Sequence, residues 1–354
     1  MPPATTSASA ATTELRRRPE QSRSTATFET LLEVAGRLLE THGFGAFTTN
    51  LLATESGVSI RAIYRYFPNK HAIVAELAGR PSVAAVGDTM WARFLVELLA
   101  HWPSGDGSSS TRYLRSTEVM NALRTRKDAA EIAALQAAGA AADRVAAQLH
   151  AGEIPLVGRT EAAVSADISA RLLAEGHDVV NFAIVAAGEN AASPHHHAGD
   201  RLIREGEIVL TDFGGTKDGY CSDITRCVFL GEPSAEVAEA YAVLHEAQAA
   251  GVRAGVVGAA CQDVDRAARK VIADAGYGEY FIHRTGHGIG MEAHEDPYMV
   301  EGNDQPIEAG HAFSVEPGIY VAGKWGMRLE DIVVATDDGP LSMNQANHAL
   351  VRIG

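Results

Sequence analysis

The chain has 354 residues, of which 46% are hydrophobic and 21% are charged, and its formal net charge is −15. This composition is ordinary for a globular protein, and the length leaves room for two domains. It excludes an integral membrane protein, because no apolar run approaches the roughly 18 residues that a membrane span requires. Residues 1–80 hold nine Lys or Arg against seven Glu, so this part is mildly basic while the remainder carries −17. The basic part hints at contact with an anion.

Two features bear on the compartment. The first 24 residues contain no apolar core segment, so we expect a disordered tail and no secretory signal over 1–24. The three cysteines, Cys221, Cys227 and Cys261, are an odd number without a close pair. This pattern predicts a protein of the reducing cytoplasm. The lack of a long apolar run predicts that a membrane is not a partner.

Four short helices are predicted between Thr27 and residue 79. The first has an amphipathic spacing from Thr27 to His42 and is expected to end at Gly43. A second begins at Thr48 or Thr49 and ends in a turn at Gly57. The third follows Ser59 as N-cap and runs over 60–67, and a fourth follows Asn69. Three helices with a glycine turn before the third predict a helix-turn-helix.

The run GVSIRAIYRYFPNK, over 57–70, resembles the N-terminal DNA-binding domain of tetracycline-repressor-type (TetR) regulators. The likeness covers about residues 26–78, and we assign 25–79 to a small all-α domain of this kind. It implies that double-stranded DNA is a partner. The side chains implied to face the major groove or its edges are Ser59, Arg61, Tyr64 and Tyr66, while Lys70 would meet phosphate. The alternatives are a helical bundle without nucleic acid, and a core position for Tyr66.

Residues 80–114 are predicted to connect two domains. Apolar residues recur on one face from Val83 to Trp102, which predicts a single helix. The following run PSGDGSSST, over 103–111, has the composition of a flexible linker. A TetR regulator would continue into a long helical domain instead, so the chain departs from that family here.

Residues 115–354 are predicted to form an α+β domain with an internal repeat. A long helix is expected after a capping box at Thr125 and Asp128. The remaining predicted elements are helices over Glu161–Glu175, Ser234–Gly251 and Cys261–Ala275 and a strand over Val179–Ala187. The segments ARLLAEG and KVIADAG lie one hundred residues apart, which suggests two halves related by a pseudo-two-fold axis.

The stretch EIVLTDFGGTKDGYCSDITR, over 207–226, predicts two strands joined by a hairpin turn. If Lys217 and Asp218 form the tip, Asp212 and Asp223 stand opposite each other, with Cβ atoms roughly 4.5 to 5.5 Å apart. Two carboxylates held that close repel each other, so the pattern predicts a cation between them. The alternative is a solvated turn with two exposed acids.

Three later motifs favour the metal site. FIHRTGHGIGMEAH contains His287, FSVEPGIY contains Glu316, and MRLEDIVV places Glu330 on the same strand face as Arg328. Two Asp, one His and two Glu make an oxygen-rich set for two divalent ions, with manganese in first place and cobalt or zinc as alternatives. The predicted metal ligands are Asp212, Asp223, His287, Glu316 and Glu330.

In this order the motifs resemble the pita-bread (creatinase/aminopeptidase) metallopeptidases, over roughly 115–354. DFGG followed by SDITR, together with SVEPGIY, is more similar to prolidase and aminopeptidase P than to methionine aminopeptidase. The resemblance implies an Xaa-Pro dipeptidase or aminopeptidase that acts on peptides with proline in the second position, and a homodimer. Those relatives carry an extra N-terminal domain, which this chain lacks.

The same resemblance implies individual roles. Glu316 would be both ligand and general base, while His195 and His294 would contact the substrate or the developing oxyanion. His283 is either a substrate contact or a core histidine, and Arg328 would pair with a ligand carboxylate or the substrate. If SPHHH, over 193–197, is a strand, neighbouring histidines face opposite ways, and His196 and His197 are expected at the surface.

The DNA-binding part leaves a second reading open. The chain could be a TetR-like transcription regulator that uses the peptidase-like domain as a ligand sensor. A third possibility is that the N-terminal domain is a passenger on an enzyme. Five intact ligands favour retained hydrolysis, because a sensor has no need of the full set.

Overall fold

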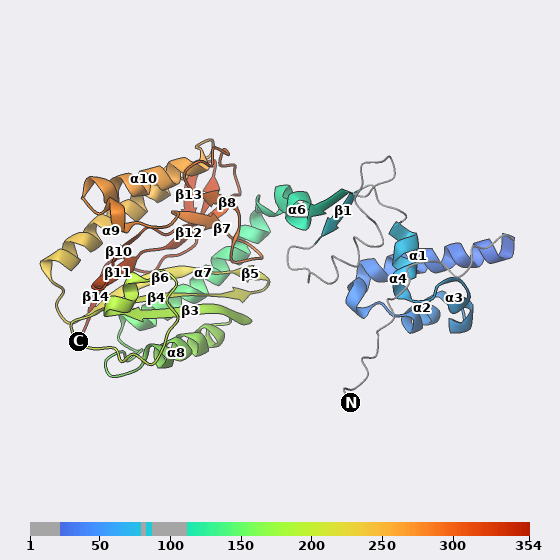
Figure 1. The fold of residues 1–354 in the computed structure, drawn as a ribbon, viewed down its shortest axis with the longest axis horizontal. Helices are drawn as coiled ribbons and strands as arrows, with labels where there is room; N and C mark the ends of the chain where they lie inside the picture. Colours follow the sequence, from blue (N-terminus) through green and yellow to red (C-terminus); the bar gives the residue numbers. More distant parts are fainter. Residues whose placement is uncertain (1–21, 79–82, 87–111) are drawn as a thin grey trace, which may run out of the picture. The chain divides into compact units, whose positions relative to one another are not determined.

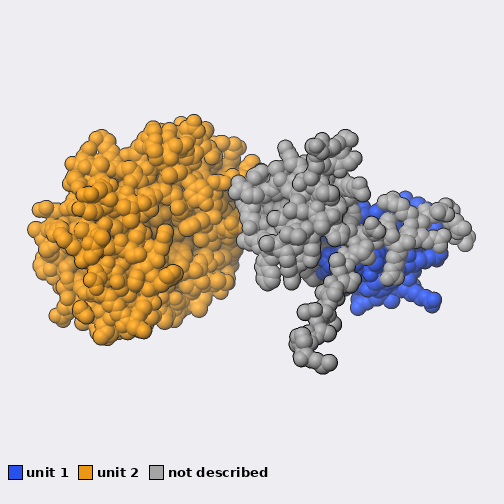
Figure 2. All heavy atoms as spheres, viewed as in Figure 1, with its two compact units in different colours: residues 1–120 blue, residues 121–354 orange. Residues whose placement is uncertain are grey.

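A computed structural model describes residues 22–78, 83–86 and 112–354. The chain divides into two compact units, residues 1–120 and residues 121–354 (Figure 2). No helix within the described ranges is long and apolar enough to cross a membrane.

Within residues 22–78 the first unit has the helices α1 (Ser22–Ala46), α2 (Thr49–Ser56), α3 (Ile60–Tyr66) and α4 (Lys70–Ala78). The predicted N-caps Ser59 and Asn69 are present, since they accept hydrogen bonds from Ala62 N–H and Ala72 N–H. The second helix begins at Thr49, as one of the two predicted starts has it, and the predicted turn residue Gly57 follows it with a left-handed φ of 66°. Helix α1 differs from its prediction at both ends. It begins inside the predicted tail, at Ser22, and continues through Gly43 to Ala46.

The core of this unit corrects one predicted DNA contact. Tyr66 is 4% exposed, and its ring packs edge-on against Phe28 at 5.6 Å between centroids. Phe67 is fully buried beside it and stacks on the same Phe28 ring at 5.0 Å. The prediction that Tyr66 faces DNA is therefore wrong, and the alternative core position is the one observed. The spacing of α3 puts Ile63 and Tyr66 on one face, which is the buried one.

The connecting segment also differs from its prediction. Val83–Val86 forms strand β1, which pairs in parallel with β2 (Arg112–Arg115), so a helix beginning at Val83 is wrong for these four residues. Parallel pairing depends on a partner strand far along the chain, which local spacing does not reveal. The rest of that predicted helix and the predicted linker, 103–111, lie outside the described residues. Helix α6 (Ser116–Arg124) follows β2.

The second unit consists of two helix pairs and two sheets (Figure 1). The helices are α7 (Ala129–His150), α8 (Glu161–Ala174), α9 (Ala235–Ala254) and α10 (Cys261–Asp274), with short 3-10 helices η1 (Gly188–Ala192) and η2 (Gly278–Tyr280). Helix α7 is capped by Asp128 with Glu131, so Thr125 is not part of the capping box. Both α8 and α10 end before a glycine with positive φ, 100° at Gly176 and 87° at Gly276, as the repeat predicts.

The first sheet has the order β14-β6-β4-β3, and its strands are β3 (Val179–Ala187), β4 (Ile208–Lys217), β6 (Ile224–Leu230) and β14 (Val351–Ile353), with β5 (Tyr220–Cys221) paired to β4. The second has the order β13-β12-β9-β7-β8 and comprises β7 (Gly286–Gly288), β8 (Glu295–Met299), β9 (Ala312–Val315), β12 (Asp331–Thr336) and β13 (Gly339–Ser342). A separate hairpin joins β10 (Gly318–Val321) to β11 (Trp325–Arg328). Side chains of α7 and α8 share a hydrophobic core with the first sheet, and side chains of α10 share one with the second.

The hairpin register corrects the predicted pairing of the two aspartates. Lys217 pairs with Tyr220, so the tip is Asp218–Gly219, and both tip residues have positive φ, 51° and 84°. A tip shifted by one residue moves every partner by two, and Asp212 therefore pairs with Thr225 rather than with Asp223. Asp212 and Asp223 still share one face of the hairpin as diagonal neighbours.

Candidate metal centre

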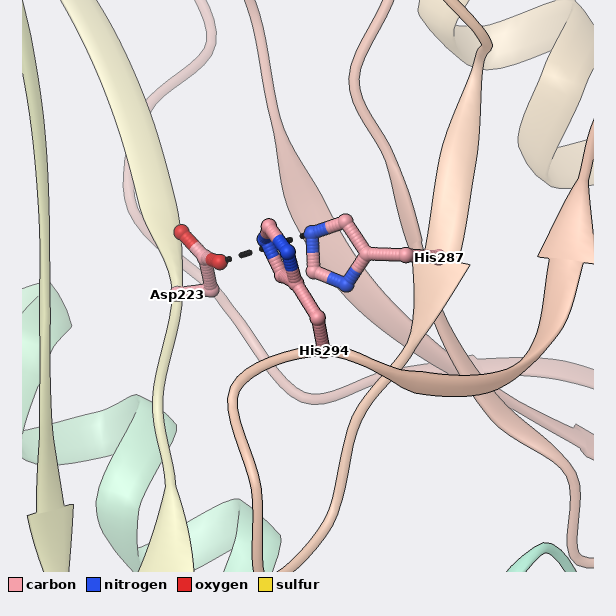
Figure 3. Close-up of side chains that lie close together, drawn as sticks. All are labelled: Asp223, His287 and His294. Atoms are coloured by element: carbon pink, nitrogen blue, oxygen red, sulfur yellow. Dashed lines mark ion pairs between the residues drawn. The ribbon is translucent and has the colours of Figure 1, made fainter. Parts of the chain in front are cut away.

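Six acidic and imidazole side chains, the five predicted ligands and His294, converge between the two sheets. In each of three groups the donor atoms lie within 4.8 Å of one another: Asp212 with Asp223 and Glu330; His287 with Glu316 and Glu330; and Asp223 with His287 and His294. His287 Nε2 lies 3.7 Å from Asp223 Oδ2 and 3.4 Å from Glu316 Oε1. Figure 3 shows Asp223 and His287 pointing toward each other, with the His294 ring beside them. The structure thus brings together all five predicted ligands.

Each of these side chains comes from a strand or from the residue next to one. Asp212 is on β4, Asp223 lies between β5 and β6, His287 is on β7, and Glu316 directly follows β9. Glu330 lies in a break between β11 and β12, where its N–H donates to Thr225 O at 3.3 Å. The expected single strand over 327–334 is therefore wrong. Nevertheless Glu330 faces the centre, while the next residue, Asp331, turns away and pairs with Arg226.

A glycine in the DFGG motif allows the close approach that this site needs. A Cβ atom at Gly214, next to Asp212 on the same strand face, would lie 2.1 Å from Ser222 O. Any larger residue would push apart the two hairpin segments that carry Asp212 and Asp223.

The chemistry of this set fits divalent cations. Asp212 Oδ1 is buried and has no hydrogen-bond partner among the described residues. A buried carboxylate oxygen without a partner is costly, and a bound cation would satisfy it. Four carboxylates and one imidazole are donors suited to manganese, cobalt or zinc.

Burial and mutual repulsion shift the pKa values of this metal-free set. Burial is the main cause that raises the pKa of Asp223 and of Glu330 well above the usual range, and the neighbouring carboxylates add to it. Burial likewise raises the pKa of Glu316 to about 7. Burial, with the nearby His294, lowers the pKa of His287 to about 3, so this imidazole is neutral at pH 7. A neutral imidazole is the form that binds metal.

Three hydrogen-bonding side chains that the sequence analysis missed hold the acids in place. Thr225 Oγ1 donates to Glu330 Oε2 at 2.6 Å and accepts from Arg328 Nε at 3.0 Å. Tyr320 OH accepts from Arg328 Nη1 at 2.8 Å. Ser314 Oγ accepts from His287 N–H at 3.0 Å and donates to Glu316 Oε1 at 3.3 Å. Thr225 and Tyr320 lie inside the quoted motifs SDITR and SVEPGIY, which was the available signal.

A cavity of about 220 Å³ opens onto these acids. Besides the five predicted ligands, it is lined by Phe182, Ile184, Pro194, His195, His283, Arg284, His294 and Arg328. His195 and His294 are both exposed at this cavity. His283 is held between Arg284 O at 2.7 Å and Tyr320 OH at 2.8 Å, and burial lowers its pKa to about 3. Charged, polar and apolar groups therefore all face the same small space.

The histidine run corrects a further expectation. Residues 193–197 follow η1 as a turn and are not a strand. His196 points inward, and its Nε2 lies 2.7 Å from Oε2 of Glu161, which is fully buried. The predicted surface position of His196 is therefore wrong. His197 is exposed, as expected.

The remaining predicted DNA contacts lie on α3 and at the start of α4. Ser59 caps α3, and Arg61 is exposed. Tyr64 is 38% exposed, and its hydroxyl lies 3.2 Å from Thr49 Oγ1. Lys70 Nζ donates to Phe47 O at 3.1 Å, so this ammonium already has a partner within its own unit.

Residues 132–337 match the family model of "Metallopeptidase family M24". The chain belongs to metallopeptidase family M24. Among the relatives of this M24 chain, a "Probable dipeptidase PepE" from Mycobacterium tuberculosis is 48% identical over 280 residues, which cover 79% of this chain and 72% of the relative. An "Xaa-Pro dipeptidase" from Lactobacillus delbrueckii subsp. lactis is 43% identical and covers 68% of this chain and 64% of its own length.

Solved structures agree with the fold of this M24 chain. The dipeptidase PepE from Mycobacterium ulcerans superposes with a TM-score of 0.75 at 37% identity, over 95% of this chain and all of that one. A prolidase from Thermococcus sibiricus gives a TM-score of 0.74 at 36% identity, over 79% of this chain and 75% of its own. The predicted pita-bread fold is thereby confirmed. A second family model, "Bacterial regulatory proteins, tetR family", matches residues 31–77, which include the helix-turn-helix.

Proposed function

We propose that this chain is a dinuclear-metal exopeptidase that removes the first residue from dipeptides or short peptides with proline in the second position. The observation that carries the proposal is the convergence of the five predicted metal ligands on one cavity of about 220 Å³. The names of the similar proteins, dipeptidase and Xaa-Pro dipeptidase, support the substrate class.

The residues that would hold the ions are Asp212, Asp223, His287, Glu316 and Glu330, with manganese as the first expectation and cobalt or zinc as alternatives. When bound, two divalent ions would activate a water molecule for attack and polarise the scissile carbonyl group.

The chain's own groups would move the proton and orient the substrate. Glu316, which lines the cavity and accepts a hydrogen bond from Ser314, would be the general base that accepts the proton of the attacking water and passes it to the leaving nitrogen. His195 and His294 both line the cavity, where they would donate to the developing oxyanion. Arg328, paired with Asp212, would orient that ligand, and His283 would support the network through Tyr320.

Hydrolysis tests the proposal directly. Purified protein is incubated with Ala-Pro, Ala-Pro-Ala and Met-Ala-Ser, with added manganese and with a chelator, and free amino acids are measured. We expect release of alanine from the proline peptides only when metal is present. Intact proline peptides in a sample that holds two metal equivalents would refute the activity.

We further propose that residues 25–79 bind double-stranded DNA. The tetR family match and the exposed Arg61 and Tyr64 on α3 support this. Arg61→Ala should weaken the retardation of a DNA fragment from upstream of the protein's own gene. Arg37→Ala, an exposed arginine on α1 paired with Glu33, serves as the matched control. Equal retardation by Arg61→Ala and wild type would count against the assignment.

The second candidate function, a TetR-like regulator that senses ligands through the peptidase domain, makes a different prediction. A sensor would bind Ala-Pro without cleaving it and would change its DNA affinity.

We retain a homodimer and a reducing cytoplasmic compartment as parts of the proposal. The three free and buried cysteines support the latter.

A further inference from the structure

The loop from Ile289 to His294 leaves β7 and returns into β8, and it carries His294 at its end. The next residue, Glu295, has a side chain that is only 8% exposed, and both of its oxygens contact cations. Lys127 Nζ lies 2.6 Å from Oε1, and Arg124 Nη2 lies 2.8 Å from Oε2. We call Arg124, Lys127 and Glu295 the Glu295 cluster.

Further hydrogen bonds join α6 to the same loop and to Asp296. Arg124 Nη1 also donates to Glu292 Oε1 at 3.1 Å. Asn121 Nδ2 donates to Asp296 Oδ2 at 2.8 Å. Three carboxylates around His294 are therefore held by donors from one short stretch of chain, residues 121–127.

The Glu295 cluster contributes little to the free energy of folding, because its charges are desolvated. The Lys127 side chain is 1% exposed, and burial lowers the pKa of its ammonium group. Desolvation of two charges offsets much of their attraction, so a buried pair often contributes little net stability. What such a pair does fix is geometry, because breaking it leaves an unpaired buried charge.

The glycine pattern of the motif accommodates this pair. A Cβ atom at Gly290 would lie 2.6 Å from Glu295 Oε1 and 2.9 Å from Lys127 Cε. The loop backbone therefore packs directly on the ion pair. It turns back through a hydrogen bond of 3.1 Å from Gly290 N–H to Glu292 O.

His294 itself has little else to fix its position. Its ring is exposed and lies against the His287 ring with 3.9 Å between centroids and an interplanar angle of 49°, and within the described residues it makes no hydrogen bond. We propose that Glu295 is a positioning residue, held by Lys127 and Arg124, that keeps His294 against the metal centre. This inference rests on the proposed function in so far as His294 contacts the substrate.

A double-mutant cycle in the full-length protein tests it. Glu295→Gln keeps the size of the side chain and removes its charge, and it should lower kcat for Ala-Pro by about 10- to 100-fold, the range seen when a supporting contact is lost. If Glu295 acts through His294, the same change in a His294→Ala background should cost less than about twofold. An equal loss in both backgrounds would overturn the proposal. So would full activity of Glu295→Gln.

Matched controls separate this effect from general damage. Glu301→Gln removes an exposed carboxylate paired with Arg266, and Lys270→Met removes an exposed ammonium paired with Asp274. Neither change should alter kcat, whereas Lys127→Met should match Glu295→Gln. Lys127→Arg should restore part of the activity, because it restores the charge.

Hydrogen exchange provides a readout that needs no activity. Amides of residues 289–296 should exchange faster in Glu295→Gln than in Glu301→Gln or wild type. If the wild type cleaves no dipeptide yet this difference is seen, the proposed function fails while the anchoring of the loop stands. Unchanged exchange in this loop would refute the anchoring itself.

Discussion

Arg328 Nη2 contacts Asp212 Oδ2 at 2.5 Å, and both residues are buried. Burial lowers the pKa of Arg328, but Tyr320, Asp212 and Glu330 face it and raise the pKa above its ordinary value. The guanidinium is therefore charged and occupies one Asp212 oxygen. The other oxygen, Oδ1, is buried and has no hydrogen-bond partner among the described residues.

Arg328→Lys should weaken metal binding about 10- to 100-fold, because a lysine cannot reach Asp212, Tyr320 and Thr225 together. The measurement is a titration of chelator-treated protein with manganese in a calorimeter. Arg253→Lys, on the exposed pair with Glu246, is the control and should leave binding unchanged. Wild-type affinity in Arg328→Lys would show that Asp212 needs no such support.

Metal affinity should fall as the pH falls through 7. Burial raises the pKa of Glu316 to about 7, so the metal-free site takes up a proton below that pH, and an ion must displace it to bind. One such group predicts a dissociation constant about tenfold higher at pH 6 than at pH 8. Titrations at pH 6, 7 and 8 measure it. A constant affinity would mean that Glu316 is already ionised in the free site.

Removal of metal should destabilise the protein. Ligand at 100 times its dissociation constant adds about 2.7 kcal/mol to the free energy of unfolding. In the apo form the Asp223 carboxyl group is buried without a cation, which raises its pKa well above the usual range. We expect chelator to lower the midpoint of thermal unfolding in wild type. In Asp212→Asn, chelator should have a much smaller effect, and an equal shift in both proteins would contradict metal binding at this residue.

Tyr66→Ala should lower the stability of the N-terminal unit by about 3 to 5 kcal/mol, because it opens a cavity beside Phe28 and Phe67. Tyr64→Ala, at 38% exposure, should cost far less. Urea unfolding followed by circular dichroism measures both. Similar losses from the two substitutions would indicate that Tyr66 is not a core residue in solution.

Local chemistry made much of the fold predictable. Strand β3 and the caps Ser59 and Asn69 match the prediction, because capping and periodicity act over a few neighbouring residues. The hairpin register was missed, since a shift of the tip to Asp218–Gly219 changes the partner of Asp212 without altering either strand's pattern. The strand β1 was missed because its partner, β2, lies about 30 residues away.

By itself the sequence determined which side chains could bind metal and which segments carry them, since the motifs place acids and a histidine next to short apolar strands. Only the tertiary structure decided how they meet: the partners of Asp212, the inward turn of His196 toward Glu161, and the contacts of Lys127 with Glu295. These contacts join residues about 35 to 170 positions apart. Their geometry depends on how the sheets and helices pack, which no local pattern of residues encodes.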